Sequence, residues 1–71
     1  MTWELYEVWG KDDDGHEELV ETTKSLKQAQ IIAKRSLDSF IESIVYQETE
    51  DGDIVEIERL TMDNSGAIIS V

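Results

Sequence analysis

The residues of this chain that could take part in catalysis are one histidine and several neighbouring carboxylates. Histidine is the only side-chain type that titrates near neutral pH without perturbation, and the single one here, His16, follows Gly15 in a charged turn where we expect no pocket. The pairs Glu17–Glu18 and Glu56/Glu58 could move protons, but we expect them on solvated strand faces. No nucleophile-elbow or phosphate-binding glycine motif occurs in the sequence. We therefore predict that the protein is not an enzyme.

A run of aspartates could bind a divalent cation. Asp12, Asp14, Gly15 and Glu21 match the spacing of positions three, five, six and twelve of an EF-hand loop. However, position one is Gly10, and the flanking segments have the pattern of strands, whereas an EF-hand is flanked by helices. The chain has no cysteine, so a thiolate metal site is excluded. We predict no metal site and no cofactor, and keep weak cation binding in the Asp12–Asp14 turn as an alternative.

Aromatic side chains could stack on the bases of a nucleic acid. The aromatic residues of the chain are Trp3, Tyr6, Trp9, Phe40 and Tyr46. Base stacking needs an accompanying basic groove, but the chain has 17 acidic and 6 basic residues and a formal charge of -11. Nucleic acids and anionic membranes should repel it. We expect most of these aromatic residues in the core, and Trp9, which ends a strand on the face of Glu7, as an interface anchor.

The elements that must position these residues begin with a hairpin. Residues 3–9 alternate, with Trp3, Leu5, Glu7 and Trp9 on one face and Glu4, Tyr6 and Val8 on the other. The segment 10–16 contains two glycines and three aspartates, which is typical of a turn. Residues 17–22 form the second predicted strand, with Leu19 and Val20 at its centre.

A helix follows the hairpin. Ser25 and Gln28 have the spacing of a capping box. The apolar residues that follow are three or four positions apart and form one stripe: Leu26, Ala29, Ala33, Leu37, Phe40 and Ile44, widened by Ile32 and Ile41. Because no glycine or proline ends the helix, its end is predicted near Glu42.

The rest of the chain predicts three more strands. Strands at 44–48 and 53–61 flank an acidic turn at 49–52, and a turn at 63–66 precedes a short apolar strand at 67–71. In the strand 53–61, Val55 and Ile57 are expected on one face and Glu56, Glu58 and Leu60 on the other. The order ββαβββ predicts one α+β domain over residues 1–71, a curved antiparallel sheet with one helix packed on one face.

The length of the chain limits its core. A chain of 71 residues buries only about 60% of the surface of its unfolded state, so we expect marginal stability and additional support from a partner or from self-association. The amino terminus lacks the pattern of a signal peptide, and no run approaches the ~20 apolar residues of a membrane span. These features lead us to expect a cytoplasmic protein.

The charges are unevenly distributed along the predicted elements. Most of the basic residues lie in or beside the helix, at Lys24, Lys27, Lys34 and Arg35, whereas carboxylates crowd the hairpins. We predict an acidic sheet face opposite the helix, which docks on a basic partner protein. Its residues are Glu17, Glu21, Glu56 and Glu58, with Asp12, Asp13, Asp14, Glu50, Asp51 and Asp53 at the margins and Trp9 as anchor.

The leading functional hypothesis is a small inhibitor or regulator that imitates the phosphates of a nucleic acid. In size and charge it is similar to the small acidic inhibitors of phages and mobile elements. One alternative is a module that forms homodimers through a strand edge at 67–71 or 3–9, with its acidity serving solubility. The other alternative is the weak divalent-cation site named above.

Overall fold

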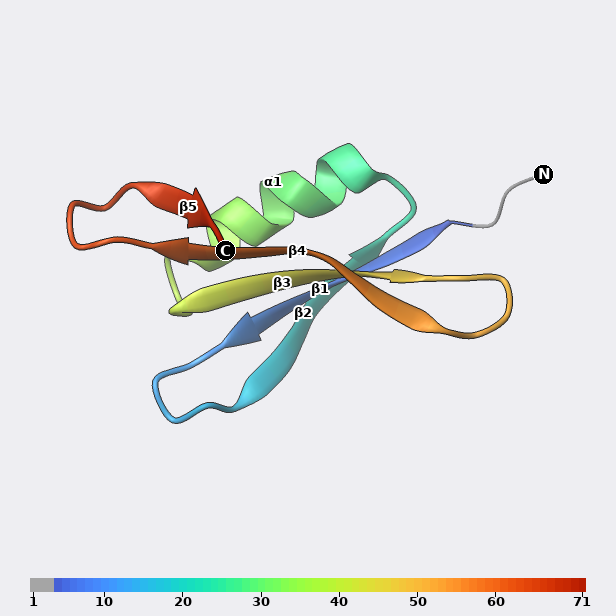
Figure 1. Cartoon of the computed structure of the whole chain (residues 1–71), viewed down its shortest axis with the longest axis horizontal. Helices are drawn as coiled ribbons and strands as arrows, with labels where there is room; N and C mark the ends of the chain where they lie inside the picture. Colours follow the sequence, from blue (N-terminus) through green and yellow to red (C-terminus); the bar gives the residue numbers. More distant parts are fainter. Residues whose placement is uncertain (1–3) are drawn as a thin grey trace.

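The computed structural model describes residues 4–71 and shows a five-stranded antiparallel sheet with one helix (Figure 1). The elements in chain order are β1 (Leu5–Lys11), β2 (Glu17–Thr23), α1 (Leu26–Ser36), β3 (Glu42–Glu48), β4 (Ile54–Met62) and β5 (Ile68–Ser70). The predicted ββαβββ order and α+β class are confirmed. Trp3, where the first predicted strand begins, lies outside the described residues.

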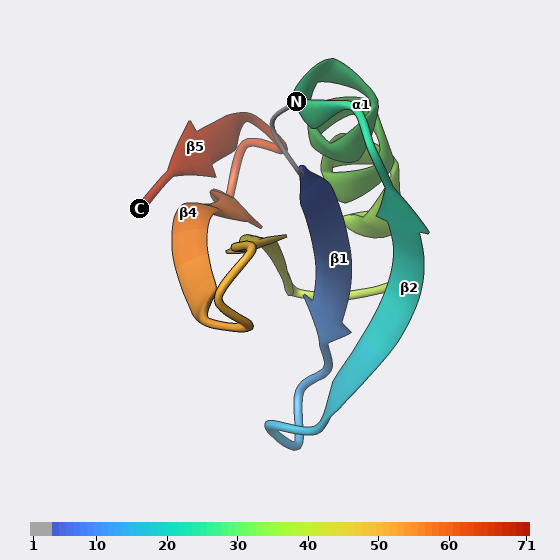
Figure 2. The same ribbon diagram turned by 90° about the vertical axis from the view of Figure 1, so that its right-hand side faces the viewer.

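The strand order in the sheet is β2-β1-β3-β4-β5. β1 pairs with β2 on one side and with β3 on the other, so β2 and β5 are the edges of the sheet. Because β3 lies on the far side of β1 from β2, the chain has to cross the sheet after β2. The helix α1 makes this crossing and packs on β1, β3 and β2 (Figure 2).

The three hairpin turns have the same construction. Each begins with an oxygen-bearing residue, Asp12, Thr49 or Asp63, whose side chain accepts a hydrogen bond from the amide four residues later at 2.9, 3.1 and 2.9 Å. The residue just before that amide is a glycine with a φ of +87°, +88° or +87°, and its own amide donates to the first residue's carbonyl at 3.0 Å. This is a three-residue loop that ends in a left-handed residue, where glycine costs no steric strain.

The helix α1 begins at the predicted cap. Ser25 Oγ accepts a hydrogen bond from the amide of Gln28 at 3.2 Å, as the capping-box pattern predicts. The reciprocal bond differs from the prediction, because the amide of Ser25 donates to Thr23 Oγ1 at 3.3 Å.

The predicted end of the helix near Glu42 is wrong, because α1 ends at Ser36. The amides of residues 37–39 donate to carbonyls three residues earlier, which tightens the chain into a turn. Ser36 supports this end, since its hydroxyl donates to the Ile32 carbonyl at 2.8 Å inside the core.

Contacts with β1 explain why the helix cannot continue. The ring of Phe40 lies directly over the backbone of Gly10, where a Cβ atom would overlap it. The amide of Ile41 donates to the Lys11 carbonyl at 2.9 Å. Ile44, which the helical stripe included, therefore belongs to β3.

The core lies between α1 and the sheet. It consists of the buried residues Tyr6, Val8, Ala29, Ile32, Ala33, Leu37, Val45 and Leu60. In β1, burial alternates strictly, with Tyr6, Val8 and Gly10 buried. These residues share the face beneath α1, as the alternation of a strand requires.

Two β-bulges interrupt the register of the sheet. In β2, Leu19 pairs with Trp9 and Glu21 pairs with Val8, so Val20 is an extra residue. In β4, Glu56 pairs with Tyr46 and Glu58 pairs with Val45, so Ile57 is an extra residue. Because an extra residue restarts the alternation, side chains two positions apart across a bulge point to opposite faces.

Candidate functional site

The side of the sheet opposite α1 carries the candidate site. We call it the helix-free face and define it by Glu7 and Trp9 of β1, Tyr46 of β3, and Glu56 and Arg59 of β4. Glu7 and Trp9 alternate with the buried residues of β1, and the other three are joined to them by cross-strand pairing. Paired residues in neighbouring strands point to the same side of a sheet.

The prediction that Glu17, Glu21, Glu56 and Glu58 share one face is wrong. Glu17 pairs with Lys11 and lies on the helix-free face, as does Glu56. Glu21 pairs with the buried Val8 and lies on the α1 side, where it borders a hollow with Ile32 and Arg35.

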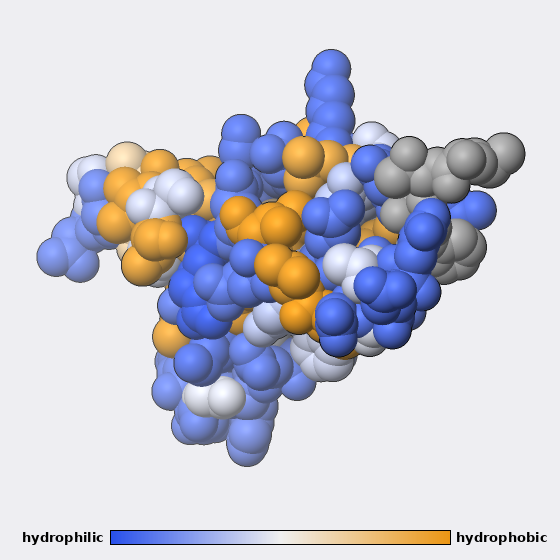
Figure 3. Space-filling model, turned by 45° about the vertical axis from the view of Figure 1, so that its right-hand side comes forward, coloured by the Kyte–Doolittle hydropathy of each residue, from blue (hydrophilic) through white to orange (hydrophobic). Residues whose placement is uncertain are grey.

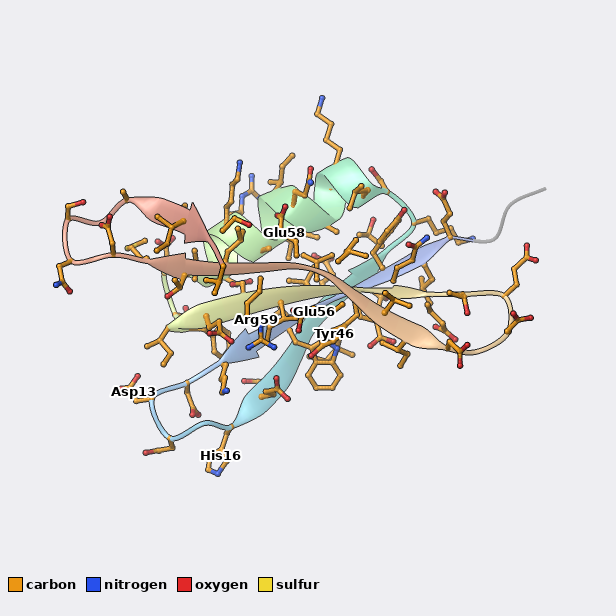
Figure 4. All side chains as sticks on the ribbon, viewed as in Figure 1. Asp13, His16, Tyr46, Glu56, Glu58 and Arg59 are labelled. Carbon is orange, nitrogen blue, oxygen red and sulfur yellow. The ribbon has the colours of Figure 1, made fainter. Side chains whose placement is uncertain are left out.

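Glu58 also lies on the α1 side. It pairs with the buried Val45, and Figure 4 shows it directed away from Glu56 and Arg59. The two bulges explain why these glutamates lie on different faces. The extra residue Val20 lies between Glu17 and Glu21, and the extra residue Ile57 lies between Glu56 and Glu58, so each bulge places one glutamate on the opposite face. Leu60 shares one face with Glu58, as predicted. Val55 was predicted on the opposite face, but it lies on this one too, because its partner Gln47 pairs with the buried Tyr6.

The predicted margins of the acidic face lie at opposite ends of the molecule. Asp12, Asp13 and Asp14 form the β1–β2 turn, whereas Glu50, Asp51 and Asp53 belong to the β3–β4 hairpin at the other end (Figure 1). The longest dimension of the molecule is 42 Å. The structure therefore does not bring the two groups of turn carboxylates together.

The β1–β2 turn gathers Asp12, Asp14 and His16, whose potential ligand atoms lie within 4.8 Å of one another. One oxygen of Asp12 accepts hydrogen bonds from the amides of Asp14 and His16 at 3.0 and 2.9 Å, which are bonds that build the turn. Glu21 pairs with Val8 inside the sheet. The spacing that resembles an EF-hand therefore does not bring Glu21 to the aspartates. The His16 side chain is 82% exposed.

The centre of the helix-free face is apolar. Ile44 is fully buried there, although no helix covers this side, and its cross-strand neighbours are Trp9 and Arg59. The long aliphatic part of an arginine can cover an apolar neighbour while its charged end stays in water.

Arg59 holds two carboxylates on this face. Its guanidinium forms ion pairs with Glu42 and Glu56, the second through two hydrogen bonds of 2.7 and 3.4 Å. The hydrogen bond from Arg59 lowers the pKa of the Glu56 carboxyl, and the carboxylates raise the pKa of Arg59. Sequence reasoning missed this residue, because Glu42 is 17 positions away and four of the other five basic residues lie in or beside the helix.

Tyr46 lies next to this group (Figure 4). Its side chain is half-buried on the helix-free face, so it lies outside the core in which most of the aromatic residues were expected, whereas Tyr6 is buried there. Burial raises the pKa of the Tyr46 hydroxyl, and the negative charges of Glu17 and Glu56 raise it further. Carboxylates from β2 and β4 therefore act on the same ring from two directions.

A shallow hollow of about 170 Å³ opens between these rings. Its lining residues are Glu7, Trp9, Glu17, Tyr46 and Ile54. Glu7 is fixed within it, since its Oε1 accepts a hydrogen bond from the Trp9 indole at 3.0 Å. The site thus combines two aromatic rings and an aliphatic side chain with carboxylates from two strands.

Family models, curated proteins and solved structures were all compared with this chain, and none of them matches it. Within residues 4–71, no helix has the length and apolar character needed to cross a membrane.

Proposed function

We propose that this protein is a non-enzymatic binding protein whose helix-free face docks on a basic region of a partner protein. The observation that carries the proposal is the hollow itself, which the rings of Trp9 and Tyr46 line together with the carboxylates of Glu7 and Glu17. Protein interfaces typically have an aromatic centre and a polar rim. Here the rim is acidic, so the complementary surface is basic.

The residues that we propose to make the contact differ in part from those expected from the sequence. Glu17, Glu56 and Trp9 lie on the helix-free face, and Glu7 and Tyr46 join them. Glu21 and Glu58 lie on the other side of the sheet and are not part of the proposed contact. Asp12–Asp14 at one end of the molecule attract the partner over a longer range.

A nucleic-acid-binding protein is one class of partner with the required chemistry. Its binding surface carries lysine and arginine side chains that neutralise phosphates, and the formal charge of -11 on a chain of 71 residues is suited to compete for them. In this role the protein would act as a small inhibitor or regulator that imitates nucleic acid. Such a role needs no catalytic group.

Two neighbouring glutamates provide a matched test. Glu17 lies on the helix-free face and Glu18, paired with Gly10, lies on the α1 side, and both are exposed. We predict that Glu17→Lys lowers capture of the partner from a native-host lysate about ten-fold, because it reverses a charge in the contact. Glu18→Lys changes the formal charge equally and should alter capture less than about two-fold.

Salt provides a second criterion. Capture by the unchanged protein should weaken as ionic strength rises, because exposed charges are screened. Equal losses in Glu17→Lys and Glu18→Lys would show that net charge alone governs binding and would contradict a specific face. Capture that is insensitive to salt would contradict a basic partner.

A further inference from the structure

We infer that the hollow between Trp9 and Tyr46 receives the guanidinium group of an arginine side chain of the partner. This inference rests on the proposed function, because it names the group that the helix-free face recognises. It assigns a binding site to residues that the acidic character of the chain alone does not single out.

The size of the hollow fits a single side chain. Its volume of about 170 Å³ is below the ~300–1,000 Å³ of typical small-molecule pockets. Three of its lining residues, Trp9, Tyr46 and Ile54, offer apolar surface to such a side chain. The hollow is open to solvent along the helix-free face, so a side chain projecting from a flat partner surface can enter it.

The charges around the hollow select a cation. Glu7 uses one carboxylate oxygen to accept from the Trp9 indole, and its second oxygen accepts no hydrogen bond from the residues at 4–71. Glu17 forms no hydrogen bond or ion pair within the same residues. Arg59 is already paired with Glu42 and Glu56, and Lys11, the cross-strand partner of Glu17, forms no ion pair within the described residues. Two carboxylates at the hollow therefore remain available to a cation from outside.

Arginine matches this combination better than lysine. Its guanidinium is planar, stacks on aromatic rings and donates hydrogen bonds from its edge to carboxylates. The helix-free face already shows the second part of this chemistry within the chain, where the Arg59 guanidinium donates twice to the Glu56 carboxylate. A lysine ammonium is a compact, strongly hydrated charge that makes less use of flat rings.

The test uses the whole 15N-labelled protein with hexaarginine and hexalysine peptides as probes. The readouts are the affinity of each peptide and the indole N–H resonance of Trp9, assigned by its loss in Trp9→Phe. We expect hexaarginine to shift this resonance and to bind several-fold more tightly than hexalysine. Trp9→Leu should weaken hexaarginine binding about ten-fold, whereas Trp9→Phe, which keeps an aromatic ring, should retain most of it.

The variants Glu17→Gln and Glu18→Gln distinguish two negative results: one in which only the arginine site is wrong, and one in which the docking face is wrong as well. Both remove one negative charge, and we expect only Glu17→Gln to weaken hexaarginine binding by more than about three-fold. If this difference holds while both peptides bind equally and the Trp9 resonance does not move, the arginine site is overturned and the docking face stands. If Glu17→Gln and Glu18→Gln weaken binding equally, the docking face itself is overturned. The resonance shift is measured on the unchanged protein, so the test does not depend on the folding of Trp9→Leu.

Discussion

At the residue scale, the direction of a side chain decides what each carboxylate can contact. Glu17 and Glu18 are neighbours in β2 but pair with Lys11 and Gly10, on opposite sides of the sheet. Arg59 neutralises Glu56 on the helix-free face, so the formal charge of the chain overstates the charge that this face presents. The carboxylates that remain beside the hollow are the ones that a basic partner can pair with.

Gly10 shows how closely the backbone of β1 approaches the chain after α1. The Phe40 ring occupies the position that a Cβ atom on Gly10 would take. We predict that Gly10→Ala lowers the free energy of unfolding by about 1–3 kcal/mol, because the ring and the turn that carries it would have to move. Urea denaturation of the purified protein measures this change.

Phe40→Ala provides the control for this prediction. The cost of Gly10→Ala should be smaller in the Phe40→Ala background, because the overlap is then relieved. Equal costs in the two backgrounds would show that the contact with Phe40 is not the cause.

At the scale of elements, the hairpin turns are the parts of the fold that short-range interactions determine most completely. The first residue of each turn binds amides within four positions, and the glycine completes the reversal. Asp63 is the most strongly bonded of these residues. Hydrogen bonds from the Ser65 hydroxyl and from the amides of Ala67 and Ser65 lower the pKa of its carboxyl.

The pKa of Asp63 predicts a pH-dependent contribution to stability. A carboxyl whose pKa is lower in the folded than in the unfolded state stabilises the fold above the unfolded-state value of ~3.9, and this contribution is lost as pH falls through the folded-state value. We expect Asp63→Asn to lower the Tm at pH 6 and the difference from the unchanged protein to shrink as pH falls below ~4. Thermal unfolding followed by circular dichroism across this pH range tests it.

Asp13→Asn is the matched control for the charge removed. Asp13 occupies the exposed part of a turn of the same construction, and within the described chain its carboxylate makes no hydrogen bond. A pH-dependent Tm difference of the same size in Asp13→Asn would assign the effect to net charge and contradict the role of the turn hydrogen bonds.

At the scale of the whole molecule, one helix of 11 residues cannot cover five strands. α1 packs on the β2-β1-β3 half of the sheet, and apolar residues of β4 and β5 stay exposed, with Met62 at 40% and Ile68 at 41%. Figure 3 shows apolar surface over the β4–β5 hairpin, at the left of the view. Within the described residues, β1 (Leu5–Lys11) pairs with β2 on one side and with β3 on the other, so it leaves no free edge for the self-association predicted through this strand.

The sheet has two edges, β2 and β5, and β5 is the one at which we expect two copies to pair. Residues 67–71 carry no charge, in contrast to the rest of this acidic chain, and an uncharged edge strand favours pairing with another strand. We predict that the molar mass rises from 8.1 kDa towards twice that value as concentration increases, and more readily at high salt, where repulsion between copies is screened. Light scattering or sedimentation equilibrium measures the mass.

Ile69→Lys should keep the protein monomeric, because it places a charge on this edge. The opposite responses to salt distinguish self-association from docking on a basic partner. A mass that stays at the monomer value to millimolar concentration would rule out pairing through β5.

The sequence by itself determined the class of the fold and its local features. The glycine-containing turns, the Ser25 cap and the alternation of β1 were predictable, because each depends on residues within about four positions or on the regular period of an element. These features were sufficient for the ββαβββ order and for Trp9 on the same face as Glu7. They also showed that the hairpins are rich in carboxylates, but not which carboxylates lie on the same face of the sheet.

Only the tertiary structure decided the strand order, the end of α1 and the composition of the candidate site. The end of α1 depends on Phe40 meeting Gly10, which is a contact between distant parts of the chain. The separation of Glu56 from Glu58 depends on an extra residue opposite β3, and a bulge is a property of two paired strands. The face that a glutamate occupies, and so the partner group it can bind, follows from that pairing.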